Sequence, residues 1–163
     1  MRAQFLALAL AAVAFAGGTQ YGLHAGFMLP TGDAADAYKP SPMIGGQILL
    51  HLPMYAIEGS VSYVFLSPED EVENFSGSVI PILAGVRTYT STLFFGGGAA
   101  LHMFSTSWDT PDGEVEESDS YFGAYGTVGT ELPMGGSEIE INGKAQWIDF
   151  DEIWLSVQAG IYF

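Results

Sequence analysis

Apolar and polar residues alternate along most of the chain. Because successive side chains of a β-strand point to opposite faces of a sheet, this two-residue period predicts strands rather than helices. Near the start of the chain, one face carries Tyr21, Leu23 and Phe27, while the other carries His24 and Met28. The pattern recurs along the chain, and eight strands are predicted, at residues 20–29, 42–52, 55–65, 78–89, 93–104, 120–132, 137–147 and 153–163.

The connections between these strands alternate in length. Long polar segments at 31–41, 66–77 and 105–119 alternate with short ones at 53–54, 90–91 and 133–136. Eight antiparallel strands can close into a small barrel without a free edge. Up-and-down connectivity would then place the long loops at one end and the short turns at the other, as is typical of outer-membrane barrels.

Pro81 lies inside the fourth predicted strand. Every strand of a closed barrel has two neighbours, and proline cannot donate a ladder hydrogen bond to either of them. We therefore expect a bulge or an extended rim at this position.

The first 16 residues have the parts of an export signal. Arg2 provides a positive start, an apolar run follows, and Ala14 and Ala16 form a small-x-small cleavage site. The apolar run is shorter than the ~20 residues that a helix needs to cross a bilayer, which favours cleavage over an uncleaved anchor. We therefore expect a signal peptide at residues 1–16 and one exported β-barrel domain at residues 17–163.

The composition excludes several classes of function. Only 4 Lys and Arg residues stand against 19 Asp and Glu residues, and a net charge of -15 repels phosphate backbones, so no nucleic-acid partner is expected. The absence of cysteine removes disulfides and Cys-type zinc sites. Hydrophobic residues make up 48% of the chain, which is far more than a disordered chain contains.

Periodicity alone does not show which barrel face points outward, because a soluble lipocalin-like barrel has the same alternation turned inside out. Of the 19 acidic residues, 15 fall in predicted loops, and the charges left for the strands are Glu58, Glu131, Glu138 and Glu140, with Arg87 and Lys144. A water-facing outer surface would need far more charge than this. The predicted fold is therefore all-β, an eight-stranded antiparallel up-and-down transmembrane β-barrel. A soluble periplasmic carrier of a small apolar ligand is the alternative.

The strand ends carry a family resemblance. The export signal, the opening strand from Tyr21 to Phe27, the Gly85-Val86-Arg87 segment and the closing Gly160-Ile161-Tyr162-Phe163 together resemble the small outer-membrane β-barrel family of OmpA-like and OmpX-like proteins. The resemblance implies a bacterial outer-membrane location among lipid and lipopolysaccharide. Its members serve as anchors, adhesins, narrow channels and, rarely, enzymes. It also implies that Phe163, with Ile161 and Tyr162 before it, is the signal read by the barrel-assembly machinery.

The strand charges predict a network inside the barrel. When strand direction is taken into account, Glu58, Arg87 and Glu140 fall at comparable heights near the short-turn end, with Glu131 lower and Lys144 higher. A charge in a narrow interior is costly unless it is paired, so we predict a salt-bridge network centred on Arg87. A plug is favoured over a gate, because the interior of an eight-stranded barrel is just wide enough for its own side chains.

Other chemistry has weaker support in the sequence. His24, His51 and His102 share the inward face but are spread along the barrel axis, whereas the ligands of one metal ion must converge. The acidic segment 109–114 lacks EF-hand spacing, so only diffuse binding of divalent cations at acidic loops is expected.

Catalysis is not expected either. His102 and Ser105 are three residues apart on a predicted strand and so point to opposite faces, and the common catalytic and phosphate-binding motifs are absent. We therefore expect no cofactor and a non-enzymatic outer-membrane barrel with a structural or surface role, acidic extracellular loops and slow passage of small solutes.

Overall fold

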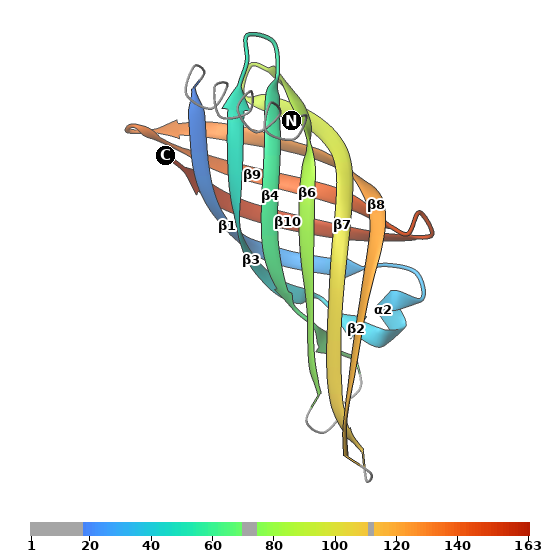
Figure 1. Cartoon of the computed structure of the whole chain (residues 1–163). Helices are drawn as coiled ribbons and strands as arrows, with labels where there is room; N and C mark the ends of the chain where they lie inside the picture. Colours follow the sequence, from blue (N-terminus) through green and yellow to red (C-terminus); the bar gives the residue numbers. More distant parts are fainter. Residues whose placement is uncertain (1–17, 70–74, 111–112) are drawn as a thin grey trace, which may run out of the picture.

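The structure, a computed structural model, describes residues 18–69, 75–110 and 113–163 (Figure 1). For residues 109, 110, 113 and 114 only the backbone is described. The predicted cleavage site at Ala14 and Ala16 lies outside the described residues.

Eight long strands form a closed antiparallel barrel in the order β1-β10-β9-β8-β7-β6-β4-β3. The chain closes on itself because β1 pairs with both β10 and β3, with Leu23 opposite Ile161 on one side and Gly46 on the other. The predicted fold class is thereby confirmed. The strands are β1 (Thr19–Pro30), β3 (Ser41–His51), β4 (Ala56–Phe65), β6 (Ser76–Thr90), β7 (Leu93–Thr110), β8 (Gly113–Met134), β9 (Ser137–Ile148) and β10 (Glu152–Tyr162).

Two of the predicted long loops contain regular structure. In the first, a short helix, α2 (Ala34–Ala37), leads into β2 (Tyr38–Lys39), which pairs with β5 (Ser67–Pro68) from the next long connection. In the described part of the chain, no helix is long and apolar enough to cross a membrane.

The prediction of an irregular loop at 105–119 is wrong. β7 and β8 remain paired from Ser105 opposite Ser118 to Thr110 opposite Gly113. β8 makes its last pair with β9 at Gly123, so the stretch 113–122 continues past the end of β9. We call residues 105–110 and 113–122 the extended hairpin, and Figure 1 shows it reaching beyond the neighbouring strands.

Of the two features expected at Pro81, a bulge or an extended rim, the bulge is absent. Pairing between β4 and β6 stops after Val61 opposite Ile82 and resumes at Val64 opposite Val79, with no residue inserted in either strand. On its other side, Pro81 keeps its place opposite His102 of β7. The missing donor therefore interrupts one ladder locally, and the register is the same on both sides of the gap.

The two faces of the barrel differ in chemistry. Outward side chains are large and apolar on every strand; among them Leu23 is 66%, Phe122 70% and Val157 54% exposed. Polar side chains are buried on the inward face; the buried polar and charged residues are His24, Ser41, Gln47, Glu58, Ser60, Ser62, Arg87, His102, Thr127, Glu140, Asn142, Lys144, Gln146, Ser156 and Gln158. A water-soluble barrel has the opposite arrangement, with its apolar residues inside.

The lumen is layered along its axis. At the loop end, an apolar cluster fills the interior, with Met28, Met43, Val64, Val79, Ile148 and Trp154 as its strand members. Toward the short turns the interior becomes polar and finally charged. The larger of the two hydrophobic clusters therefore lies at the loop end, and a second, smaller cluster is formed by Leu83, Ala100 and Tyr125.

Candidate functional site

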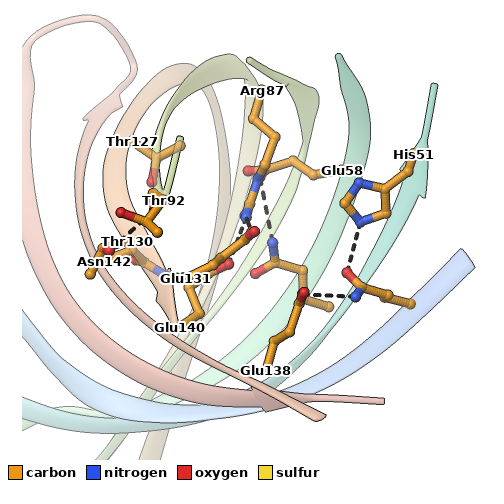
Figure 2. Close-up of polar contacts among 12 residues, drawn as sticks. His51, Glu58, Arg87, Thr92, Thr127, Thr130, Glu131, Glu138, Glu140 and Asn142 are labelled. Carbon is orange, nitrogen blue, oxygen red and sulfur yellow. Dashed lines mark hydrogen bonds and ion pairs between the residues drawn. The ribbon is translucent and has the colours of Figure 1, made fainter. Parts of the chain in front are cut away.

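The charged layer at the short-turn end is built around one guanidinium group. Arg87 of β6 forms ion pairs with Glu58 of β4 (Nη2–Oε2, 2.6 Å), Glu140 of β9 (Nη1–Oε2, 2.6 Å) and Glu131 of β8 (Nη1–Oε1, 3.2 Å). Its Nε also donates to Glu58 Oε2 at 2.6 Å. Figure 2 shows these carboxylates gathered around the Arg87 side chain. Four strands are thus tied together across the lumen.

Strand register explains why these side chains meet. Arg87 lies opposite Ala56, so Glu58 is its diagonal neighbour on β4. Glu131 and Glu140 lie directly opposite each other, an arrangement of like charges that is unfavourable on its own. Because Arg87 Nη1 contacts both carboxylates, it compensates this repulsion.

A glycine gives the backbone and the Cβ atom of Arg87 their space. Gly96 of β7 lies directly opposite Arg87. A Cβ atom at this position would lie 2.8 Å from Val86 O and 2.9 Å from Arg87 Cβ, which is closer than such atoms pack. A larger residue at position 96 would therefore force the backbone around Val86 and Arg87 to shift.

Sequence reasoning missed three members of this layer. Phe94 is fully buried, with its ring centroid 4.0 Å from Arg87 Cζ, in cation–π contact. The Tyr125 hydroxyl donates to Glu58 Oε1 at 2.5 Å, and Asn142 Nδ2 donates to Glu140 Oε1. The signal was available, because all three occupy inward positions of predicted strands, but only charged residues were considered.

Lys144 does not join the network by contact. Its side chain is 3% exposed, and its Nζ lies 5.9 Å from the Tyr125 ring centroid. Within the described residues, this Nζ has no hydrogen-bond or ion-pair partner. The structure therefore brings together four of the five predicted network residues and places the fifth further toward the middle of the lumen.

The three histidines occupy separate levels, each with its own partner. Nε2 of His24 is hydrogen-bonded to Ser62 Oγ (2.9 Å), that of His51 to Gln20 Oε1 (2.7 Å) and that of His102 to Gln146 Oε1 (3.0 Å). Gln20 in turn donates to Glu138, which extends the polar layer at the short-turn end (Figure 2). No group of three or more His, Asp or Glu residues in the described ranges is arranged to hold a metal ion.

The charged groups of this layer are shielded from bulk water. Glu58, Arg87 and Glu140 are each 1% exposed, so their charges are compensated by one another and not by bulk water. Removing one partner of such a buried group leaves an uncompensated charge, which is strongly unfavourable. The ion pairs join β4, β6, β8 and β9 across the lumen.

We predict that Tyr125→Phe lowers the free energy of unfolding in lipid by about 1–2 kcal/mol, because Glu58 loses a buried hydrogen-bond donor while the ring and its packing remain. Urea titration in phospholipid vesicles, followed by tryptophan fluorescence, measures this change. Tyr63→Phe is the matched control, since Tyr63 is on the outward face. An equal loss in both variants would contradict a role for the hydroxyl.

Solved structures with the same architecture are eight-stranded membrane barrels. Neisserial surface protein A matches with a TM-score of 0.59 at 9% identity, covering 88% of this chain and 95% of that one. The N-terminal β-barrel domain of Pseudomonas aeruginosa OprF matches with a TM-score of 0.57 at 16% identity, covering 90% and 99%. The fold is that of a small outer-membrane β-barrel.

A third small outer-membrane barrel aligns with the chain as well. Ail, the attachment invasion locus protein of Yersinia pestis, solved in complex with the heparin analogue sucrose octasulfate, has a TM-score of 0.63 at 15% identity, covering 90% of this chain and 99% of that one. No protein-family model and no curated protein sequence matches the chain. The likeness therefore establishes the outer-membrane barrel fold and not a shared activity.

Proposed function

We propose that this chain is a non-enzymatic protein of the bacterial outer membrane, with a structural or surface role. The observation that carries the proposal is the distribution of side chains over the two barrel faces. The exterior is apolar on every strand, whereas the interior contains buried polar and charged groups. Only a lipid environment makes such an exterior favourable on all sides. The alternative of a soluble carrier has less support, because a soluble barrel would turn its apolar side chains inward, whereas here large apolar side chains are exposed on every strand.

The plug sets the limit on transport. Arg87 and its carboxylates close the short-turn end, and the apolar cluster around Trp154 fills the loop end. These two layers support a structural role, with at most slow passage of small solutes through the lumen. The barrel then serves mainly as a rigid base for the groups at its loop end.

The loop end faces outward in this proposal and is acidic. The heparin analogue bound by Ail is a polyanion, whereas this chain has a net charge of -15, which opposes the same kind of ligand. Lipopolysaccharide and the outer-membrane lipid are its proposed surroundings, with divalent cations bridging acidic loops to anionic headgroups. Part of the acidic segment 109–114 lies outside the described residues.

The C-terminal strand supports a further part of the proposal. Phe163 is 65% exposed, and its backbone forms a reciprocal pair of hydrogen bonds with Tyr21 at the seam where the barrel closes. Ile161 and Tyr162 precede it on β10, with Tyr162 buried in the lumen. We propose that these three residues form the signal for the barrel-assembly machinery.

Circular dichroism tests the proposal directly. Residues 17–163, diluted from denaturant, are expected to form β-structure in detergent micelles or lipid vesicles and to remain unfolded or aggregate in plain buffer. The reason is that the exposed apolar band has no water-soluble arrangement. A chain that folds and stays soluble in plain buffer would overturn the membrane assignment.

A further inference from the structure

The loop end of the barrel holds an open cavity of about 490 Å³, which the charged layer at the other end does not involve. We call it the loop-end cavity. Three parts of the chain surround it: the extended hairpin, the turn between β9 and β10, and the segment of α2 and β2. It lies where β8 has passed its last pairing with β9, at Gly123 opposite Ile148.

The floor of the cavity is aromatic. Four rings line it, from Tyr38, Phe104, Tyr121 and Trp154. They are in mutual contact: the Phe104 centroid lies 5.6 Å from those of Tyr121 and Trp154, and the Tyr38 centroid lies 6.2 Å from that of Trp154. These rings cover the apolar cluster that fills the lumen below, so the floor is firmly supported.

The walls of the cavity carry only negative charge. Its acidic lining residues are Asp33, Glu117, Asp119, Asp149, Asp151 and Glu152. None of the basic side chains that the structure describes lines it, since Arg87 and Lys144 lie inside the barrel and Lys39 Nζ donates to Glu69 O. Burial, and then the charges of Glu117 and Glu152, raise the pKa of the Tyr38 phenol, which reports the same negative field from inside the cavity.

The spacing of these groups indicates the kind of cation. Metal ions need several ligands within about 2–3 Å of one point, and no described group of His, Asp and Glu residues has this arrangement. Aromatic rings attract organic cations through their faces and also bury alkyl groups. A ligand with several separate positive charges joined by methylene segments therefore matches dispersed carboxylates around an aromatic floor.

We propose that the loop-end cavity binds an alkyl polyamine, with its ammonium groups at the carboxylates of the β8 edge and the β9–β10 turn and its methylene segments on the aromatic floor. The barrel would then carry a site for small polycations on its outer side, in addition to its structural role.

The test uses spermidine as the probe and the full barrel in phosphatidylcholine nanodiscs, with isothermal titration calorimetry at 100 mM salt. Glu117→Gln, Asp119→Asn and Glu152→Gln combined are expected to weaken spermidine binding at least about tenfold, because three of the carboxylates that contact the ligand are neutralised. The matched control combines Asp36→Asn, Glu69→Gln and Glu116→Gln. These residues also lie at the loop end, do not line the cavity, and change the net charge equally.

One substitution of the control set is adjacent in sequence to one of the test set and removes the same charge. Glu116 and Glu117 are neighbours on the exposed part of β8, and only Glu117 lines the cavity. If both sets of substitutions weaken spermidine binding equally, the effect comes from the net charge of the protein and not from the cavity, and the proposal fails. It fails equally if the wild-type barrel does not bind spermidine.

Two further measurements distinguish the contribution of the aromatic floor to binding from that of the carboxylates. Calcium chloride is expected to bind more weakly than spermidine, because it cannot use the rings. Tyr38→Leu is expected to weaken spermidine binding several-fold and to leave calcium binding unchanged, since it removes a ring and no formal charge. Calcium binding as tight as that of spermidine, or an identical response of both ligands to Tyr38→Leu, would overturn the proposed mode of binding.

Discussion

Replacing Arg87 by methionine is expected to lower the free energy of unfolding of the barrel in lipid by about 3–5 kcal/mol. Arg87 is 1% exposed and forms ion pairs with Glu58, Glu131 and Glu140. Methionine keeps much of the volume but leaves three carboxylates facing one another without a cation. Urea unfolding in phospholipid vesicles, followed by tryptophan fluorescence, gives the change in free energy.

A combined variant distinguishes charge from packing. In Arg87→Met with Glu58→Gln and Glu140→Gln, the carboxylates that lie 2.6 Å from the guanidinium are neutral, so most of the lost stability is expected to return. If the combined variant is as unstable as Arg87→Met alone, the layer contributes through shape, and the ion pairs are not the reason for its stability.

An arginine at the middle of the outward face is expected to have the second largest effect. Val61 lies near the centre of β4, is 51% exposed, and pairs with Gly46 and Ile82. Val61→Arg is expected to destabilise the barrel in lipid by about 2–4 kcal/mol, because a charge at the bilayer midplane loses its hydration. The same unfolding titration measures it.

Depth in the bilayer provides the control for this variant. Ile153 also faces outward and is 39% exposed, but it lies one residue from the loop-end start of β10. Ile153→Arg is therefore expected to cost only about 0–1 kcal/mol, as is usual near the interface. Equal costs at the two positions would mean that the apolar band does not cross a bilayer.

The parts of this fold that the sequence predicts are the strands whose two faces lie in different environments, one outside the barrel and one in the lumen. Residues such as Leu23 and His24 alternate because one faces outward and the other faces the lumen, and this difference marked all eight strands. The meeting of Arg87 with Glu58 and Glu140 followed by counting residues from the short turns, since antiparallel register is constant along each pair of strands.

The extended hairpin was missed for the complementary reason. Residues 116–119 are polar at every position, so no alternation marks this stretch as a strand. Its pairing with β7 comes from the continuation of a ladder that begins inside the barrel. The four-residue helix α2 is too short to show a helical period, and the loop-end cavity depends on both elements.

In the proposed orientation, with the loop end facing outward, the extended hairpin also affects how the protein contacts other molecules. Its six paired positions from Ser105–Ser118 to Thr110–Gly113 span about 20 Å at the usual rise per residue. A disordered loop loses conformational freedom when something binds to it, whereas a paired ladder is already ordered. A macromolecule that binds the extended hairpin in this orientation therefore contacts a backbone that is already ordered, and it loses less conformational entropy than on binding a disordered loop.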